Sequence, residues 1–144
     1  MYFDDLSVGF THETGTVQLS EEEIIAFAKQ YDPQPFHTDR KAAADSIYGG
    51  IIASGFHTLL AAFDLILKSN VWTEASMGSP GLDEVRFKRP VRPGDSLRVR
   101  MKVTATEASK TRPDRGRVTF YYEILNQADE VVISYYTVQL LKRR

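Results

Sequence analysis

The chain has 144 residues, no cysteine and a formal net charge of −1 at pH 7. This length suits a single domain that buries its own apolar core without disulfides or a structural metal. The nearly balanced charge gives no general attraction for nucleic acid or for an acidic membrane surface. The absence of cysteine excludes thiolate nucleophiles and Cys-based zinc sites, and it is typical of a reducing compartment.

Two further features favour a cytoplasmic location. The opening residues MYFDDLSVGF contain no basic region followed by an apolar run, so we expect no signal peptide. The longest apolar stretch, Ile51–Leu67, includes Ser54, His57 and Asp64. It is too short and too polar to cross a bilayer, and we expect it to lie in the protein interior.

The first part of the chain predicts a strand and then a helix. Thr11–Gln18 has the pattern of a strand. Ser20, with Glu23 three residues later, forms a capping box that begins a helix. The helix ends at an Asp-Pro dipeptide, because a residue before proline is disfavoured in the α region. Its apolar stripe and its final dipeptide are Ile24, Phe27, Ala28, Tyr31 and Asp32-Pro33.

Two more helices follow in the chain. A short one is predicted from about Arg40 to Ser46, with Thr38 or Asp39 as its N-cap. After Gly49-Gly50, an apolar segment predicts a central helix over about residues 54–69. Because that segment is apolar on nearly all sides, we expect other elements to enclose it.

The second half of the chain has the alternation of strands with one buried face. Turn residues at Arg92–Asp95 and Asn126–Asp129 bracket these strands. The last strand, Val131–Leu141, is apolar on both faces, which indicates that its outer face is covered, for example by a second subunit. The alternating apolar residues are Leu97, Val99, Met101, Val103, Val118, Phe120, Tyr122 and Ile124. Together the elements predict one α+β domain.

The segment most suggestive of chemistry is Asp32-Pro33-Gln34-Pro35-Phe36-His37. Two titratable side chains lie five residues apart, and the two prolines between them predict a stiff loop rather than a helix. A stiff loop suits acid–base groups that must be positioned in advance. An ordinary turn aspartate and a structural histidine remain the alternative, because spacing alone does not bring the side chains together.

The same segment resembles the D-x-N-P-x-H motif of the MaoC-like dehydratase family, with Gln34 in place of the usual Asn. Ile52-Ala53-Ser54-Gly55 resembles the family's [IV]-x-H-G segment at the start of its helix, with Ser54 in place of His. Phe87–Asp95 is similar to its F-x-x-P-V-x-x-G-D hairpin, and Tyr2–Gly9 to its N-terminal strand region. The resemblance covers essentially the whole chain.

The resemblance implies a single MaoC-like hot-dog domain over residues 1–144, in which an antiparallel sheet wraps around the central helix. It implies an (R)-specific enoyl-CoA hydratase, which adds water reversibly to the double bond of a trans-2-enoyl thioester. The thioester carrier would be coenzyme A or an acyl-carrier protein. We expect a homodimer or larger homo-oligomer, with no metal and no cofactor beyond the coenzyme A of the substrate.

The resemblance also implies roles for five residues. Asp32 and His37 would hold the reacting water, one removing a proton as oxygen attacks C3 and the other delivering a proton to C2. Gly55 would offer its backbone N–H to the thioester carbonyl. Ser54 and Gln34 would take part in substrate binding. Many hydratases of this kind also carry a serine about five residues beyond this glycine, where this chain has Leu60, a departure that bears on substrate choice.

Several other polar residues have two interpretations. We expect His12 and His57 to be core or surface residues and not metal ligands. Asp64 meets a polar partner at a subunit boundary or lines the cavity. Basic residues are solvated, or some of them meet the phosphates of the carrier; they are Arg86, Lys88, Arg89, Arg92, Lys110, Arg112, Arg115, Arg117 and Lys142–Arg144.

Two other functions remain open at this stage. A hot-dog thioesterase shares the fold but uses a carboxylate on the central helix or its partner, for which Asp64 is the candidate. A non-catalytic subunit that binds acyl thioesters would need no acid–base pair.

Overall fold

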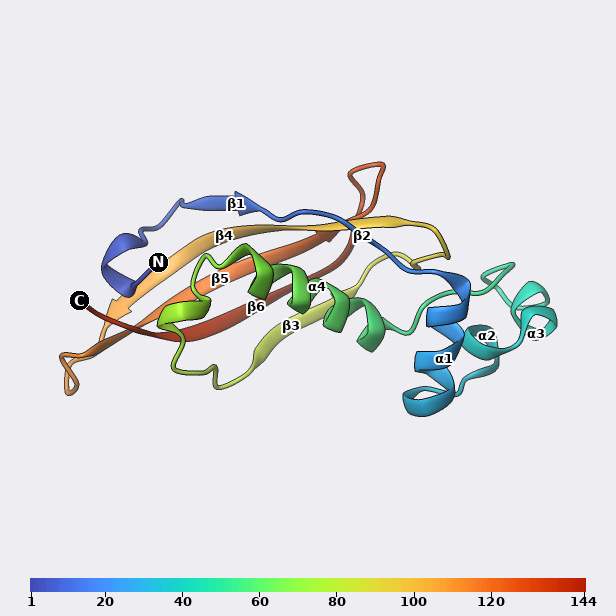
Figure 1. Ribbon diagram of the computed structural model, residues 1–144, viewed down its shortest axis with the longest axis horizontal. Coiled ribbons are helices and arrows are strands. Elements are labelled where there is room, and N and C mark those ends of the chain that lie inside the picture. Colours follow the sequence, from blue (N-terminus) through green and yellow to red (C-terminus); the bar gives the residue numbers. More distant parts are fainter.

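A six-stranded antiparallel sheet dominates the computed structural model, which describes residues 1–144 (Figure 1). Its strands are β1 (Thr11–Glu13), β2 (Val17–Gln18), β3 (Leu82–Phe87), β4 (Ser96–Ala108), β5 (Arg115–Leu125) and β6 (Val131–Lys142). The three long strands β4, β5 and β6 pair in chain order. β1 pairs with β4 at one edge, β3 pairs with β6 at the other, and β2 pairs with the start of β4.

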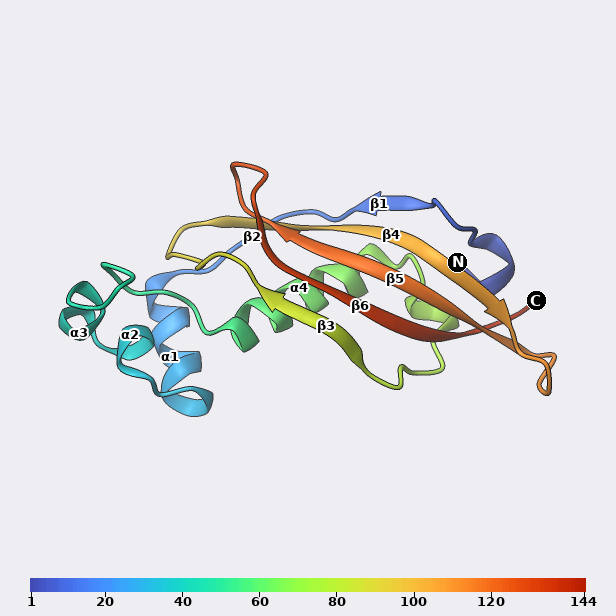
Figure 2. The same cartoon turned by 180° about the vertical axis from the view of Figure 1, so that it is seen from behind.

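The longest helix, α4 (Gly55–Ser69), lies across one face of this sheet (Figures 1 and 2). Ala62, Leu65 and Ile66 of the helix join the same apolar core as the inward residues of the strands. All eight alternating residues predicted to face inward are buried: Leu97, Val99, Met101, Val103, Val118, Phe120, Tyr122 and Ile124. The predicted α+β domain, with a sheet around a central helix, is therefore confirmed.

Three further helices lie beyond the amino end of α4 (Figure 1). They are α1 (Glu21–Tyr31), α2 (Pro35–Thr38) and α3 (Arg40–Ala44), and two short 3-10 turns complete the chain, η1 (Phe3–Asp5) and η2 (Thr73–Ala75). The predicted capping box is present, since Ser20 Oγ accepts from Glu23 N at 3.1 Å and Glu23 reaches back to Ser20 N. Asp39 caps α3 by accepting from Ala42 N at 2.8 Å.

Three local predictions were wrong. Thr11–Gln18 is not one strand, because Thr14, Gly15 and Thr16 separate β1 from β2. The segment before His37 is not only loop, because Pro35 occupies the first position of α2, where a missing N–H costs no helical hydrogen bond. Tyr31, expected on the apolar stripe of α1, is 66% exposed, although Ala28 in the same turn is buried.

The expectation that α4 is enclosed on nearly all sides was also wrong for the single chain. Phe56, Leu60 and Phe63 are exposed at helical spacing, and Leu82 and Phe87 of β3 are exposed beside them. We call these five residues the apolar face. Of the outward side chains of β6, Tyr136 and Val138 are only half-buried. No helix of the structure has the length and apolar character needed to span a membrane.

The attachment of α4 to the sheet can be tested at Ile66, which is 1% exposed. Ile66→Ala should lower the free energy of unfolding by about 2–5 kcal/mol, because it leaves a cavity in the core. Lys68→Ala on the exposed side of the same helix should cost about 0.5 kcal/mol or less, since it removes only an i,i+4 ion pair. Urea denaturation followed by circular dichroism measures both; equal losses would contradict this packing.

Candidate active site

His37 is held in one orientation by the backbone. It is buried in α2, and its Nδ1 lies 2.6 Å from the carbonyl oxygen of Ile52. A carbonyl accepts only, so Nδ1 carries the proton and donates it to Ile52. The other ring nitrogen, Nε2, therefore faces Asp32, whose Oδ2 lies 3.3 Å away. The backbone thus sets both the direction and the tautomer of the imidazole.

The carboxylate of Asp32 is held from two sides. Asp32 follows the last residue of α1, where Pro33 ends the helix. Gln34 Nε2 donates to Oδ1 at 2.7 Å, and Ser54 Oγ donates to Oδ2 at 2.7 Å. Partial burial alone would raise the pKa of Asp32, but these hydrogen bonds and the nearby His37 outweigh it and lower the pKa. The carboxylate is therefore ionised at neutral pH.

This geometry leaves a place for a shared donor. When His37 is neutral with its proton on Nδ1, Nε2 has a lone pair and the carboxylate also has only acceptors. The two atoms then cannot hydrogen-bond to each other, although they are 3.3 Å apart. A molecule with two O–H donors, such as water, satisfies both of them. The pair is thus suited to bind and polarise a water molecule.

The amino end of α4 lies beside this pair. Ser54 is the N-cap residue, but its hydroxyl is engaged by Asp32 and does not cap the helix. Along α4, the first backbone amide that has a helical hydrogen-bond partner is that of Thr58, which donates to Ser54 O at 3.1 Å. The amides of Gly55 and its next two neighbours have no partner inside the helix, and they carry the positive end of its dipole.

A cavity of about 490 Å³ opens at these groups, and we call it the Asp/His cleft. Four of the five predicted site residues line it: Asp32, His37, Gly55 and Gln34. The fifth, Ser54, is fully buried behind Asp32. Its contact is with the carboxylate, and its predicted substrate contact stays a prediction. The structure therefore brings together residues that two separate segments of the sequence supply.

Phe87 belongs to this cleft, although the sequence pointed to it only as part of a hairpin motif. A Cβ atom at Gly55 would overlap the ring of Phe87. Glycine at this position thus lets β3 pass close to the start of α4. The sequence contained the hairpin motif and the glycine as separate signals, and nothing in the local pattern shows that Phe87 packs against Gly55.

The basic residues are divided between the two ends of the sheet. Lys88 and Arg89 line the Asp/His cleft, and Arg89 also pairs with Glu130 at 2.8 Å. The turn between β4 and β5, which contains Lys110 and Arg112, lies at the opposite end of the sheet from α1–α3 (Figures 1 and 2). Arg143 and Arg144 pair with Asp4 and Asp5 near the amino terminus. Lys88 and Arg89 are thus the basic residues that the structure puts at the cleft.

The remaining polar candidates do not enter the cleft. His57 stacks on Phe27 with ring centroids 4.5 Å apart, and burial lowers its pKa. Asp64 pairs with Lys68 at 2.6 Å on the exposed side of α4 and lines neither this cleft nor the larger cavity described next. No three His, Asp or Glu side chains come together as metal ligands. A metal-free site stays a prediction.

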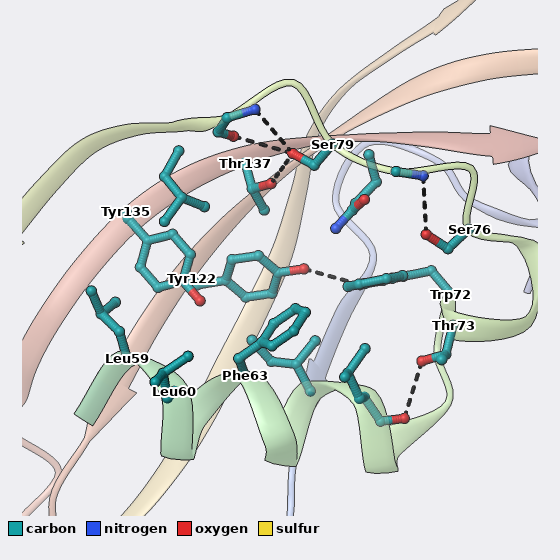
Figure 3. Close-up of a pocket in the computed structure, with 16 residues that line it drawn as sticks. Leu59, Leu60, Phe63, Trp72, Thr73, Ser76, Ser79, Tyr122, Tyr135 and Thr137 are labelled. Atoms are coloured by element: carbon teal, nitrogen blue, oxygen red, sulfur yellow. Dashed lines mark hydrogen bonds between the residues drawn. The ribbon is translucent and has the colours of Figure 1, made fainter. Parts of the chain in front are cut away.

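A second and slightly larger cavity, of about 520 Å³, was missed by the sequence interpretation. It lies between α4 and the inner face of β5 and β6, where Tyr122 and Tyr135 project toward the helix (Figure 3). We call it the tyrosine cavity. Its signal in the sequence was the series Tyr135, Thr137 and Gln139, three polar groups on the same face of β6.

Comparison with known proteins identifies the family of this chain. A family model described as the MaoC like domain matches residues 7–123. The chain belongs to the MaoC-like family. The matched residues include the segment from Asp32 to His37, the start of α4, and the strands from β1 to most of β5.

Individual relatives and solved structures agree with this assignment. The MaoC-like dehydratase from Rhodospirillum rubrum is 37% identical with a TM-score of 0.94, and the alignment covers 100% of this chain and 98% of that one. The R-hydratase PhaJ1 from Pseudomonas aeruginosa is 25% identical with a TM-score of 0.71, covering 99% and 86%. The uncharacterised protein YdeM from Bacillus subtilis is 29% identical over 146 residues, 99% of this chain and 100% of YdeM. The fold is the hot-dog fold of MaoC-like hydratases and dehydratases.

The support of Asp32 by Ser54 can be tested by titration. Ser54→Ala removes one of the hydrogen bonds that lower the pKa of Asp32, so the pKa should rise. A carboxyl group whose pKa is lowered in the folded state stabilises the fold at pH values above its ordinary pKa. This stabilisation is lost as the pH falls through the lowered pKa. The variant should lose part of that contribution at neutral pH.

Carbon-13 NMR titration of the Asp32 carboxyl measures the first effect, and urea denaturation between pH 3 and 7 measures the second. Ser46→Ala is the matched control, because the Ser46 hydroxyl bonds only within its own turn. An unchanged Asp32 titration in Ser54→Ala would show that the hydroxyl does not support the carboxylate.

Proposed function

We propose that this protein adds water reversibly to the double bond of a trans-2-enoyl thioester, as an (R)-specific enoyl-CoA hydratase. The observation that carries the proposal is the pairing of Asp32 and His37, whose Oδ2 and Nε2 lie 3.3 Å apart at a cleft. Membership of the MaoC-like family and the similarity to an R-hydratase support it.

In the proposed reaction, one water molecule donates to both Asp32 and His37. One member of the pair removes a proton from the water as its oxygen bonds to C3 of the acyl chain. This proton passes to the other member, 3.3 Å away, which delivers it to C2. The C2–C3 double bond becomes a single bond, so one hydrogen and one hydroxyl are added. We treat the two groups as a unit, because closely coupled groups exchange protons and titrate together.

Negative charge develops on the thioester carbonyl oxygen as water attacks C3. The unpaired amide of Gly55, at the positive end of the α4 dipole, would donate to that oxygen. Donors that are already in place stabilise such charge without reorganisation. Because Gly55 has no side chain, the carbonyl can approach the backbone beside the ring of Phe87.

The carrier of the acyl group would be recognised by charge. Lys88 and Arg89 line the Asp/His cleft, and the phosphates of coenzyme A or of an acyl-carrier pantetheine arm need such cations. The proposal includes no metal and no cofactor beyond the coenzyme A of the substrate. The cytoplasmic location stays a prediction from the sequence.

The thioesterase alternative depends on a carboxylate from the central helix. Asp64 is the only candidate, and it pairs with Lys68 outside both cavities. A non-catalytic binding subunit would have no use for an ionised carboxylate held beside an oriented imidazole. Both alternatives therefore explain less of the geometry than hydration does.

The apolar face supports the proposal that two copies of the chain associate. Its five large apolar side chains are between 44% and 65% exposed in the single chain. An exposed apolar patch of this kind is typical of an interaction surface. A second copy laid against α4 and β3 would cover it, and we propose a homodimer.

The acid–base pair can be tested with crotonyl-CoA and longer enoyl-CoAs. Asp32→Asn and His37→Gln should each lower the hydration rate about 100-fold or more, because proton transfer by a positioned side chain contributes at least this much. Loss of absorbance at the enoyl thioester band measures the rate. Asp114→Asn and His12→Gln, which change the same residue types far from the cleft, should keep wild-type rates. Full activity of either pair variant on a confirmed substrate would refute its assigned role.

The dimer can be tested by sedimentation velocity. Leu60→Glu introduces a charge into the apolar face and should shift the protein from a dimer toward a monomer. Val8→Glu is the control, because Val8 is an exposed apolar residue outside that face. A wild-type monomer, or a dimer that both variants leave intact, would contradict this interface.

A further inference from the structure

Gln34 is the residue between Asp32 and His37 that hydrogen-bonds to both of them. Its backbone N–H donates to the carbonyl oxygen of Asp32 at 2.8 Å, and its own carbonyl oxygen accepts from the backbone N–H of His37 at 2.9 Å. Its side-chain Nε2 donates to Oδ1 of Asp32 at 2.7 Å. Gln34 therefore connects the two members of the pair through its backbone and through its side chain.

The two prolines beside Gln34 limit the freedom of its backbone. Each proline fixes its own φ angle and restricts the residue before it. Gln34 precedes Pro35 and has the extended backbone that this position favours, with φ −74° and ψ 141°. Pro33 and Pro35 have no N–H, so Gln34 supplies the backbone donor of this turn. The Gln34 side chain thus projects from a backbone that is already held in place.

The side chain of Gln34 orients the Asp32 carboxylate together with Ser54. The last torsion of an aspartate side chain has a broad range, so a carboxylate held at one oxygen can still turn. Gln34 holds Oδ1, and Ser54 Oγ holds Oδ2 at 2.7 Å. With both oxygens held, Oδ2 stays 3.3 Å from Nε2 of His37. Loss of the Gln34 donor would leave one hydrogen bond to orient the carboxylate.

The contact also affects the charge of Asp32. A carboxylate only accepts hydrogen bonds, so the NH₂ group of the Gln34 amide faces Oδ1. Partial burial raises the pKa of Asp32, and the hydrogen bond from Gln34 is the strongest of the contacts that lower it. Gln34 is exposed and lines the Asp/His cleft, yet its donor is directed at this carboxylate. Its amide therefore helps both to aim Asp32 and to keep it ionised.

We infer that Gln34 is a positioning residue of the proposed hydration. It acts through Asp32, by aiming Oδ2 at Nε2 of His37 so that one water molecule contacts both atoms, and it does not bind the substrate. The inference rests on the proposed function, because it assigns a role in that reaction. It replaces the substrate-binding role that the sequence resemblance implied for Gln34.

The first test is Gln34→Met, which removes the amide and nearly keeps the length of the side chain. The assay uses crotonyl-CoA or a longer enoyl-CoA. The kcat should fall about tenfold or more, because small displacements of reacting groups slow a reaction strongly. The KM should stay within about twofold of the wild-type value, because a residue that does not bind the substrate adds nothing to ground-state binding.

The pH dependence of the same variant gives a second readout. Without the Gln34 donor, the pKa of Asp32 should rise. A carboxylate with a higher pKa becomes protonated at a higher pH, so the acid limb of the kcat/KM profile should move to higher pH. Carbon-13 NMR titration of the Asp32 carboxyl in the free protein should show the same rise in pKa.

Gln34→Glu is the second variant, and it puts another carboxyl group beside Oδ1 of Asp32. Two ionised carboxylates at one site repel each other, so the pair takes up one proton as the pH falls. The protonated carboxyl group can donate to Asp32, as the amide does in the wild type. The kcat of this variant should therefore be low in neutral and mildly alkaline buffer and rise as the pH is lowered, whereas the wild-type kcat should not rise.

Gln127→Met is the matched control. Gln127 Nε2 donates to Oδ1 of Asp95 at 3.0 Å, so the variant breaks the same kind of contact, and neither residue lines the Asp/His cleft. It should keep the wild-type kcat, KM and pH profile. Circular dichroism spectra and melting curves identify a variant that fails to fold, and the other Gln34 variant then decides.

The outcomes separate this inference from the proposed function. If the wild type hydrates no enoyl-CoA, the proposed function fails and the inference fails with it. If the wild type is active and Gln34→Met raises KM by more than about twofold, the hydratase stands and the inference is overturned, because Gln34 then binds the substrate. An unchanged kcat or Asp32 titration in Gln34→Met, or a wild-type pH dependence in Gln34→Glu, would also overturn it.

Discussion

The hydrogen bond from Ser54 to Asp32 joins the end of α1 to the start of α4 across 22 residues of sequence. A second contact, from His37 to the carbonyl of Ile52, ties α2 to the same segment. Between them they hold the carboxylate and the imidazole on the backbone that begins α4. Because α4 packs on the core of the sheet, the site takes its rigidity from the whole domain. The pairing of Asp32 with His37, the amide of Gly55 and the cleft all depend on this junction.

The fold was predictable wherever a local pattern was sufficient. The alternation of apolar and polar residues predicted β4 and β5, and the capping box predicted the start of α1. Both features depend only on residues that are neighbours in the sequence. Tyr31 shows the limit of this reasoning. It fits the helical stripe of α1, yet two thirds of it is exposed, because the chain places little against it beyond Phe27. The prediction that α4 is enclosed was wrong for the same reason, because periodicity shows which residues are apolar and not what lies against them.

The site was predictable in its residues but not in its contacts. Spacing could not show that Asp32 and His37 converge, because the convergence depends on Ile52 and Ser54, which come from another segment. The substitutions in the family motifs become intelligible in the structure. Ser54, in place of His, has a hydroxyl short enough to be fully buried against Asp32, and Gln34, in place of Asn, reaches the other oxygen of that carboxylate. Both substitutions therefore preserve an anchored carboxylate.

Leu60 is a departure of another kind, because it lines the tyrosine cavity and not the Asp/His cleft. The two spaces have opposite electrostatics. The Asp/His cleft contains an ionised carboxylate and the unpaired amides at the positive end of the α4 dipole. The tyrosine cavity has no charged residue in its lining, and an ion moved there would lose its hydration without gaining a partner. Helix α4 contributes to both: its amino end presents polar backbone to the cleft, while its next turns present Leu59, Leu60 and Phe63 to the cavity. A change at Leu60 therefore alters the tyrosine cavity and leaves the Asp32–His37 pair in place.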